Sequence, residues 1–286
     1  MSGPSWRPLQ AFDRRALTEA RLQAHFAAQW LARMARAYIL ERPADGHTNL
    51  GWDNATGGLR THRLPDGARL ALRVADLTLV LQNTAGEVPA LPLAGRTDAD
   101  VCSWLAPLMT EKGLDARTLG AVSPYDMPEH PLAHGGRYAP SSALGVLADW
   151  YADANMVLGE LRQSLMTRGL DVPPVRLWPH HFDLDTLIAF MTKDGEQGSM
   201  GVGFSPGDEY YDEPYFYVSL HPAPHVAMLP DLPEIGHWHT DDFTAAIATA
   251  SRILATKNQA ADTAASLHAT TDIALKTLRL TSNTAR

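Results

Sequence analysis

Histidine, carboxylate and tyrosine side chains are concentrated between Trp178 and Thr240. Half of the chain's twelve histidines lie there, in groups at residues 180–181, 221–225 and 237–239. Imidazole and carboxylate groups serve as acids and bases in catalysis and are also nitrogen and oxygen ligands of metal ions. We therefore expect this part of the chain to hold any ion or small polar ligand, although no motif in it names a reaction and no catalytic residue is assigned.

The spacing of two histidines is compatible with a metal site. His237 and His239 are two residues apart, so an extended backbone places both imidazoles on one face. Together with His181 and Asp183 they offer the ligands of a three- or four-ligand site for zinc, iron or manganese. In the alternative interpretation the two histidines are partly exposed loop residues that pair with the acidic residues after them. Both interpretations stay open.

Two predicted strands carry polar side chains on one face. Regular alternation over residues 178–185 puts His181, Asp183 and Asp185 on the same side. Residues 215–221 likewise place Tyr215, Tyr217 and Ser219 on one side, with Phe216 and Val218 on the other. Each polar row either lines a ligand site or meets solvent, and Pro179 near the start of the first row favours an edge of a sheet.

A third polar row lies on a helix. Residues 13–40 have apolar side chains every four positions, which predicts a long amphipathic helix. His25, Gln29 and Arg33 follow the edge of its apolar stripe at i, i+4 and i+8. A base, an amide and a guanidinium in line can recognise a carboxylate or phosphate group. The alternative is a solvated helix edge.

The order of predicted elements indicates an α+β fold with mostly antiparallel strands. Each half reads as a helix, about three strands and a helix, which suggests an internal duplication, and the alternative is two unrelated halves. We predict a first half over residues 1–122, a Pro/Gly-rich linker over 123–140, a second half over 141–257 and a C-terminal helix and tail over 258–286. The predicted helices cover 13–40, 98–112 capped by Asp98, 144–165, and a segment capped by Asp241 up to 254. The predicted strands cover 48–53, 59–64, 69–82, 175–191, 199–205 and 215–221, with 88–93 extended.

The composition limits the classes of function. The 286-residue chain has a net charge of −8 and no Lys/Arg-rich run, which argues against a nucleic-acid partner. No apolar run reaches the ~18 residues typical of a membrane span, and the first residues lack the apolar core of a secretory signal. Cys102 is the only cysteine. We expect a soluble cytoplasmic protein whose partner is a small polar or anionic molecule, with a homodimer as a further option.

Over residues 6–254 the chain resembles an uncharacterised bacterial family known only as a domain of unknown function. The likeness rests on the helical line His25, Gln29 and Arg33, where the family tends to have lysine at the last place. It also includes the strand at His47 and the segments 182–184, 203–207 and 213–217. Many members have Trp-Gly-Ser where this chain has residues 179–181. The resemblance favours His25, Gln29, Arg33, His47 and Asp183 as pocket residues and implies no activity or cofactor.

Taken together, the sequence predicts a small-molecule pocket between the two halves. The candidate ligand-binding residues are His25, Gln29, Arg33, His47, Trp178, Asp183, Tyr215 and Tyr217. A metal-assisted enzyme would use His181, Asp183, His237 and His239 as ligands or acid–base groups. A ligand-binding protein without catalysis and an oligomeric scaffold are the alternatives, and whether the protein is an enzyme is left open.

Overall fold

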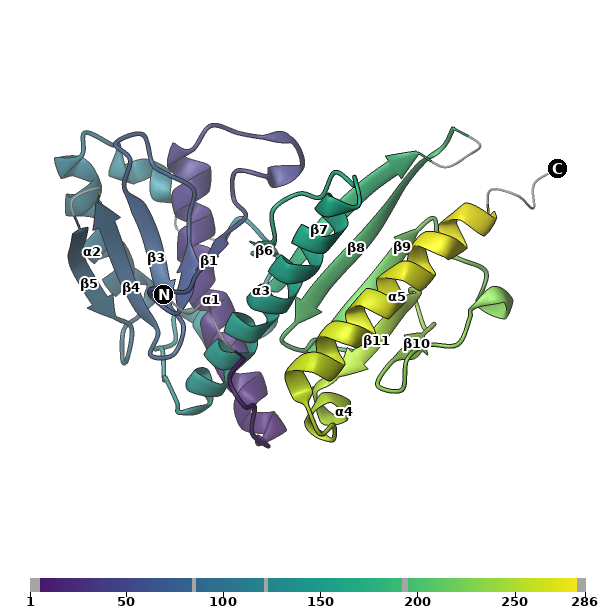
Figure 1. Cartoon of the computed structure of the whole chain (residues 1–286). Helices are drawn as coiled ribbons and strands as arrows, with labels where there is room; N and C mark the ends of the chain where they lie inside the picture. The colour runs from purple at the N-terminus through teal and green to yellow at the C-terminus, as the bar shows by residue number, and fades with distance from the viewer. Residues whose placement is uncertain (1–5, 84–85, 121–122, 192–194, 282–286) are drawn as a thin grey trace. The chain divides into compact units, whose positions relative to one another are not determined.

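The computed structural model, which describes residues 6–83, 86–120, 123–191 and 195–281, divides the chain into two compact units. The unit that we call N-terminal contains Phe12–Ala152 and Arg176–Phe182. The C-terminal unit contains Met1–Ala11, Asp153–Val175 and Asp183–Arg286. Each unit combines helices with an antiparallel sheet (Figure 1), so the predicted α+β class is confirmed.

The N-terminal unit is a long helix packed against a meander of short strands. Helix α1 (Arg14–Tyr38) starts where the Asp13 side chain accepts a hydrogen bond from the Ala16 N–H, and it packs against β3. The strands pair in chain order: β1 (Gly51–Asp53), β2 (Gly58–Arg60), β3 (Arg69–Arg73), β4 (Thr78–Asn83) and β5 (Gly86–Pro92). Helix α2 (Asp98–Glu111), the 3-10 turns η1 (Pro43–Asp45), η2 (Ala116–Leu119) and η3 (Pro131–His134), and β6 (Arg176–Trp178) complete the unit.

Two local predictions in this unit are wrong. The single strand expected over 69–82 is a hairpin of β3 and β4, whose turn includes Leu77 at a φ of 48°. The cap of α2 is Thr97 rather than Asp98. The Thr97 hydroxyl accepts the Asp100 N–H, and the Asp100 carboxylate accepts the Thr97 N–H, so both orphan donors are satisfied.

The C-terminal unit has a sheet of longer strands. Helix α3 (Ala143–Thr167) enters the unit at Asp153. The strands of the unit lie in the order β10 (His237–His239), β11 (Ala245–Thr249), β9 (Tyr215–His221), β8 (Gln197–Ser205) and β7 (Asp183–Met191). The 3-10 turn η4 (Val226–Met228) and helices α4 (Ala250–Leu254) and α5 (Gln259–Thr281) follow or interrupt them.

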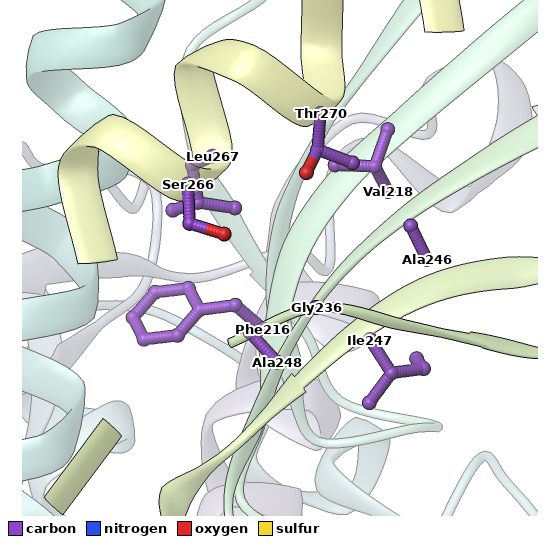
Figure 2. A pocket seen from close by; sticks show the side chains of 9 residues that line it. All are labelled: Phe216, Val218, Gly236, Ala246, Ile247, Ala248, Ser266, Leu267 and Thr270. Atoms are coloured by element: carbon purple, nitrogen blue, oxygen red, sulfur yellow. The ribbon is translucent and has the colours of Figure 1, made fainter. Parts of the chain in front are cut away.

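Helix α5 covers one face of this sheet. Phe216 and Val218 of β9 line one gap of about 10 Å³ together with Ser266, Leu267 and Thr270 of α5 (Figure 2). Because side chains alternate along a strand, Tyr215 and Tyr217 lie on the opposite face. The predicted division of this strand into an apolar and a tyrosine-bearing face is therefore confirmed.

The prediction of a helix after Asp241 is wrong for most of the segment. Residues Ala245–Thr249 form β11, which pairs with β9 from Ala245 to Thr249, and helix α4 begins only at Ala250. All five residues of β11 are buried, because α5 covers the face with Ala246 and Ala248 and tyrosine rings pack on the face with Ala245 and Ile247. A strand buried on both faces has no polar–apolar alternation. The apolar residues of this segment therefore also fit the spacing of a helix, which is why a helix was predicted.

The unit boundaries differ from the predicted halves. The segment expected to be a linker, 123–140, contains η3 and belongs to the N-terminal unit. The first sheet is a meander in chain order, whereas β11 in the second lies between β10 and β9, and the internal duplication is not confirmed. Within the described residues, no helix is both long and apolar enough to cross a membrane.

The strand expected over 175–191 is interrupted in its middle. Strand β6 ends at Trp178, whose carbonyl accepts the Phe182 N–H at 2.7 Å in a turn. Phe182 is buried with a φ of 61°, a left-handed conformation that a bulky residue rarely adopts. Its ring stacks on His25 with centroids 4.9 Å apart, and the Tyr151 hydroxyl donates to its carbonyl at 2.6 Å. Packing and this hydrogen bond hold the strained turn in place.

Replacing Tyr151 by phenylalanine removes the donor to the Phe182 carbonyl. We expect Tyr151→Phe to lower the free energy of unfolding by about 1–3 kcal/mol, because the buried carbonyl is left without that hydrogen bond. Urea titration followed by circular dichroism measures this change. Tyr38→Phe is the matched control, since it deletes an exposed hydroxyl that donates to the Asp115 carbonyl, and it should change stability by less than ~0.5 kcal/mol. Equal effects of the two substitutions would contradict the prediction.

Candidate functional site

The face of the C-terminal sheet opposite α5 carries a group of polar side chains, which we call the tyrosine–aspartate cluster. Its members are Asp183, Asp185, Asp208, Tyr211, Tyr215, Tyr217, His237 and His239. Strand register builds its central row: Asp185 pairs with Gly203, Gly203 with Tyr217, Tyr217 with Ile247, and Ile247 with His237. Residues directly opposite each other in a sheet project to the same face, so this row crosses the sheet from β7 to β10.

Tyr217 connects two strands that are not neighbours. Its hydroxyl donates to Asp183 Oδ2 at 2.5 Å and lies 3.2 Å from Asp185 Oδ2. The ring passes over β8 at Gly203, where a Cβ atom would lie 2.5 Å from the tyrosine hydroxyl and 2.7 Å from the Asp185 Cβ. Glycine at position 203 is therefore what lets the Tyr217 hydroxyl reach β7.

Asp183 has an unusual electrostatic environment. Burial raises the pKa of its carboxyl to about 6, although the hydrogen bond from Tyr217 acts in the opposite direction and the charge of Asp208 adds to the rise. Its second oxygen, Oδ1, is buried and has no hydrogen-bond partner. Burial and the neighbouring carboxylates raise the pKa of Tyr217 well above its ordinary value, so this hydroxyl stays a neutral donor. Asp183 can consequently exchange a proton near neutral pH beside a fixed donor.

Two further tyrosines extend the cluster toward β10. Tyr215 donates to Asp208 Oδ2, and burial raises the pKa of Tyr215. Its ring lies 4.9 Å from that of Tyr211 and 6.2 Å from that of Tyr217. Asp208 in turn positions Tyr211, because its Oδ1 atom accepts the Tyr211 N–H at 3.0 Å. The three rings therefore form a continuous aromatic row beside the carboxylates.

The two histidines of the cluster share one tyrosine hydroxyl. His237 Nε2 and His239 Nδ1 each lie 3.1 Å from the Tyr211 oxygen. His239 Nε2 lies 2.6 Å from the Asp241 carbonyl oxygen, which can only accept, so Nε2 donates there and Nδ1 faces the Tyr211 hydroxyl. Burial lowers the pKa of His237. A polar chain thus runs from His237 through Tyr211 and His239 to the Asp241 carbonyl.

The candidates on α1 make hydrogen bonds within the N-terminal unit. His25 Nε2 and Gln29 Nε2 both donate to the Pro179 carbonyl, each at 2.7 Å. Arg33 does not join them: it pairs with Asp98 at 2.6 Å and lies over the Trp30 ring. These partners hold the turn after β6 and the start of α2 against the helix.

Of the remaining predicted residues of this unit, His47 contacts the chain at Arg42, whereas Trp178 and His181 lie at the turn after β6. His47 Nδ1 accepts the Arg42 N–H at 3.4 Å. The Trp178 ring packs edge-on against the His180 ring, with centroids 6.0 Å apart. The centroids of the His180 ring and the exposed His181 ring are 4.4 Å apart. His181 is in the turn rather than on a strand, so the predicted row of His181, Asp183 and Asp185 is wrong for its first member. Asp183 and Asp185 do share a face of β7.

Three of the four predicted metal ligands bind tyrosines, whereas His181 lies exposed in the turn after β6. Asp183 binds Tyr217, while His237 and His239 bind Tyr211. In the described part of the chain, no three His, Cys, Asp or Glu side chains are grouped so as to hold a metal ion.

Three residues that build the site are not among the candidates predicted from the sequence. The roles of Asp208 and Tyr211 depend on the conformation of the loop that carries them, which residue spacing does not reveal. Gly203 had a detectable signal, because glycines at 201 and 203 alternate with apolar residues on β8 and leave one face of the strand without side chains at these two positions. Such a face leaves room for a large side chain from a neighbouring strand.

No family model, no curated protein and no solved structure matches the chain. The resemblance to a bacterial family of unknown function therefore stays a prediction. Function must be inferred from the geometry of the side chains.

Adding one methyl group at position 203 tests the position of Tyr217. We expect Gly203→Ala to displace the tyrosine hydroxyl from Asp183 and to lower the free energy of unfolding by about 1–3 kcal/mol, because the new Cβ overlaps the ring. Gly159→Ala is the control: this exposed glycine on α3 has nothing within 4 Å, and alanine should stabilise the helix by roughly 0.5–1 kcal/mol. Urea unfolding measures the stability of both variants. If Gly203→Ala unfolds with the same free energy as the wild type, the position of Tyr217 does not depend on glycine at position 203.

Acidification tests the buried state of His25. Burial lowers the pKa of His25 to about 4, against the opposing effect of its bond to Pro179. The unfolded chain takes up a proton near pH 6.5 while the folded chain does not, so stability is lost as the pH falls from about 6.5 to about 4. In urea titrations across this range, the wild type should lose ~3 kcal/mol more than His25→Gln, which has no titrating ring. Parallel pH profiles would contradict the assignment.

Proposed function

We propose that this protein binds a small polar molecule at the tyrosine–aspartate cluster, with Asp183 as the central contact. The observation that carries the proposal is the buried Oδ1 atom of Asp183, which lacks a hydrogen-bond partner while Oδ2 is held by Tyr217. Leaving a buried polar atom unsatisfied costs about 1–3 kcal/mol, and such atoms are rare in folded proteins. A ligand that donates a hydrogen bond to Oδ1 removes this cost.

The surroundings of Asp183 support a binding role. Tyr217 and Asp185 are half-buried, so the row that contains them is reachable from solvent. Both lie on paired strands, which fix the direction of polar groups more firmly than loops do. A carboxyl that titrates near neutral pH beside a fixed hydroxyl can also move a proton to or from a bound molecule. Binding requires the contacts alone, and proton transfer is the chemistry that they permit.

A ligand screen with variants tests the proposal. We expect some members of a library of small amines, alcohols, amides and carboxylates to raise the melting temperature of the wild-type protein, since a ligand that binds only the folded state stabilises it. Asp183→Asn and Tyr217→Phe should weaken binding of these hits about tenfold or more, which corresponds to ~1.4 kcal/mol. Tyr38→Phe, which alters a tyrosine outside the cluster, should leave the response intact.

Two outcomes would overturn the proposal. The first is a library in which no compound stabilises the wild-type protein. The second is a set of hits whose stabilisation persists in both Asp183→Asn and Tyr217→Phe, with circular dichroism showing that both variants are folded. In the second case the ligand binds elsewhere on the chain.

A further inference from the structure

We propose that the ligand of the tyrosine–aspartate cluster is a small organic amine bound in its protonated form. This inference rests on the proposed function, because it names the chemical class that the same side chains recognise. Three properties of the cluster lead to it: the sign of its charges, the hydrogen-bonding capacity of Asp183, and the aromatic row beside the carboxylates.

The charged groups of the cluster are acidic. Asp183, Asp185 and Asp208 converge on the hydroxyls of Tyr217 and Tyr215. The hydroxyls remain neutral, since burial raises the pKa of both tyrosines. The positive charge of Arg252 acts on Tyr211 and His237, and no cation is among the causes that shift the pKa of Asp183 or Tyr217. An anion at Asp183 would meet carboxylates without compensation, whereas a cation offsets their mutual repulsion.

The hydrogen-bonding pattern requires a donor from the ligand. Tyr217 satisfies Oδ2 of Asp183, and Oδ1 is the acceptor left over. An ammonium group brings N–H donors and a positive charge together, and charge-assisted hydrogen bonds are roughly twice as strong as neutral ones. A neutral alcohol could donate to Oδ1 as well, but it would leave the charge of the carboxylates uncompensated.

The aromatic row suits an organic cation in particular. Tyr211 and Tyr217 are half-buried and flank Tyr215, with ring centroids 4.9 Å and 6.2 Å from it. A cation within about 6 Å of an aromatic ring is attracted by roughly 0.5–2 kcal/mol, and the apolar part of an amine packs on the same rings. The carboxylates therefore suit the ammonium group of a small amine, and the neighbouring tyrosine rings suit its apolar part.

Three probes of the same shape separate the classes. Benzylamine is a cation at neutral pH, benzyl alcohol is its neutral counterpart, and benzoate is an anion. In isothermal titration calorimetry at pH 7 we expect benzylamine to bind the full-length protein about tenfold or more tightly than either of the others. Asp183→Asn should weaken benzylamine binding at least as much, and Tyr217→Phe should weaken it as well.

A charge-matched control separates a specific site from general attraction to an acidic protein. Asp231→Asn removes the same charge from an exposed loop of the same unit, and benzylamine affinity should stay within about twofold. A loss equal to that of Asp183→Asn would overturn the inference. The absence of benzylamine binding to the wild type, or equal binding of benzyl alcohol or benzoate, would overturn it too.

Failure of the amine inference can be told apart from failure of the binding site. If benzyl alcohol or benzoate binds as well as benzylamine and Asp183→Asn abolishes that binding, the site stands and the ligand is not selected as a cation. If benzylamine does not bind and the hits of the library screen persist in Asp183→Asn and Tyr217→Phe, both the site and its ligand class are wrong.

Discussion

The Tyr217 hydroxyl donates a hydrogen bond to Asp183 across an intervening strand, and the polar face of the C-terminal sheet is organised around this contact. The bond forms because Gly203 leaves β8 without a side chain beneath the tyrosine ring. It holds one oxygen of a desolvated carboxyl and leaves the other without a partner. The Tyr217 ring contacts Tyr215, and Tyr215 contacts Tyr211, so the aromatic row extends from this hydrogen bond toward His237 and His239.

In the N-terminal unit, the predicted polar residues of α1 make hydrogen bonds and an ion pair within the unit. His25 and Gln29 lie along a buried helix, and both donate to one carbonyl in the strained turn that ends at Phe182. Arg33 neutralises Asp98 at the start of α2. The hydrogen bonds of His25 and Gln29 specify how the helix packs against the turn. In the C-terminal unit, the buried Oδ1 atom of Asp183 has no hydrogen-bond partner and lies on a carboxyl whose pKa burial raises to about 6. The proposed site lies in the C-terminal unit because Asp183 combines these two properties.

Local sequence patterns predicted some elements well and misassigned others whose conformation depends on distant parts of the chain. Helices α1 and α3 and strand β9 lie close to their predicted positions, because their apolar residues repeat with the period of their own structure. The turn within 179–182 and the central strand β11 were misassigned. Phe182 is held in a left-handed conformation by contacts with His25 and Tyr151, which are distant in the sequence. Strand β11 is buried on both faces and so lacks the alternation that identifies a strand.

The sequence by itself determined the class of fold, the face of β9 that carries Tyr215 and Tyr217, and the common side of His237 and His239. These features follow from the two-residue period of a strand, which requires no knowledge of its neighbours. Only the tertiary structure decided that Asp185, Gly203 and Tyr217 stand in one row, and that Asp208 and Tyr211 close over it from a loop. Strand register and loop conformation depend on pairing between distant segments, so the spacing of residues along the chain could not reveal them.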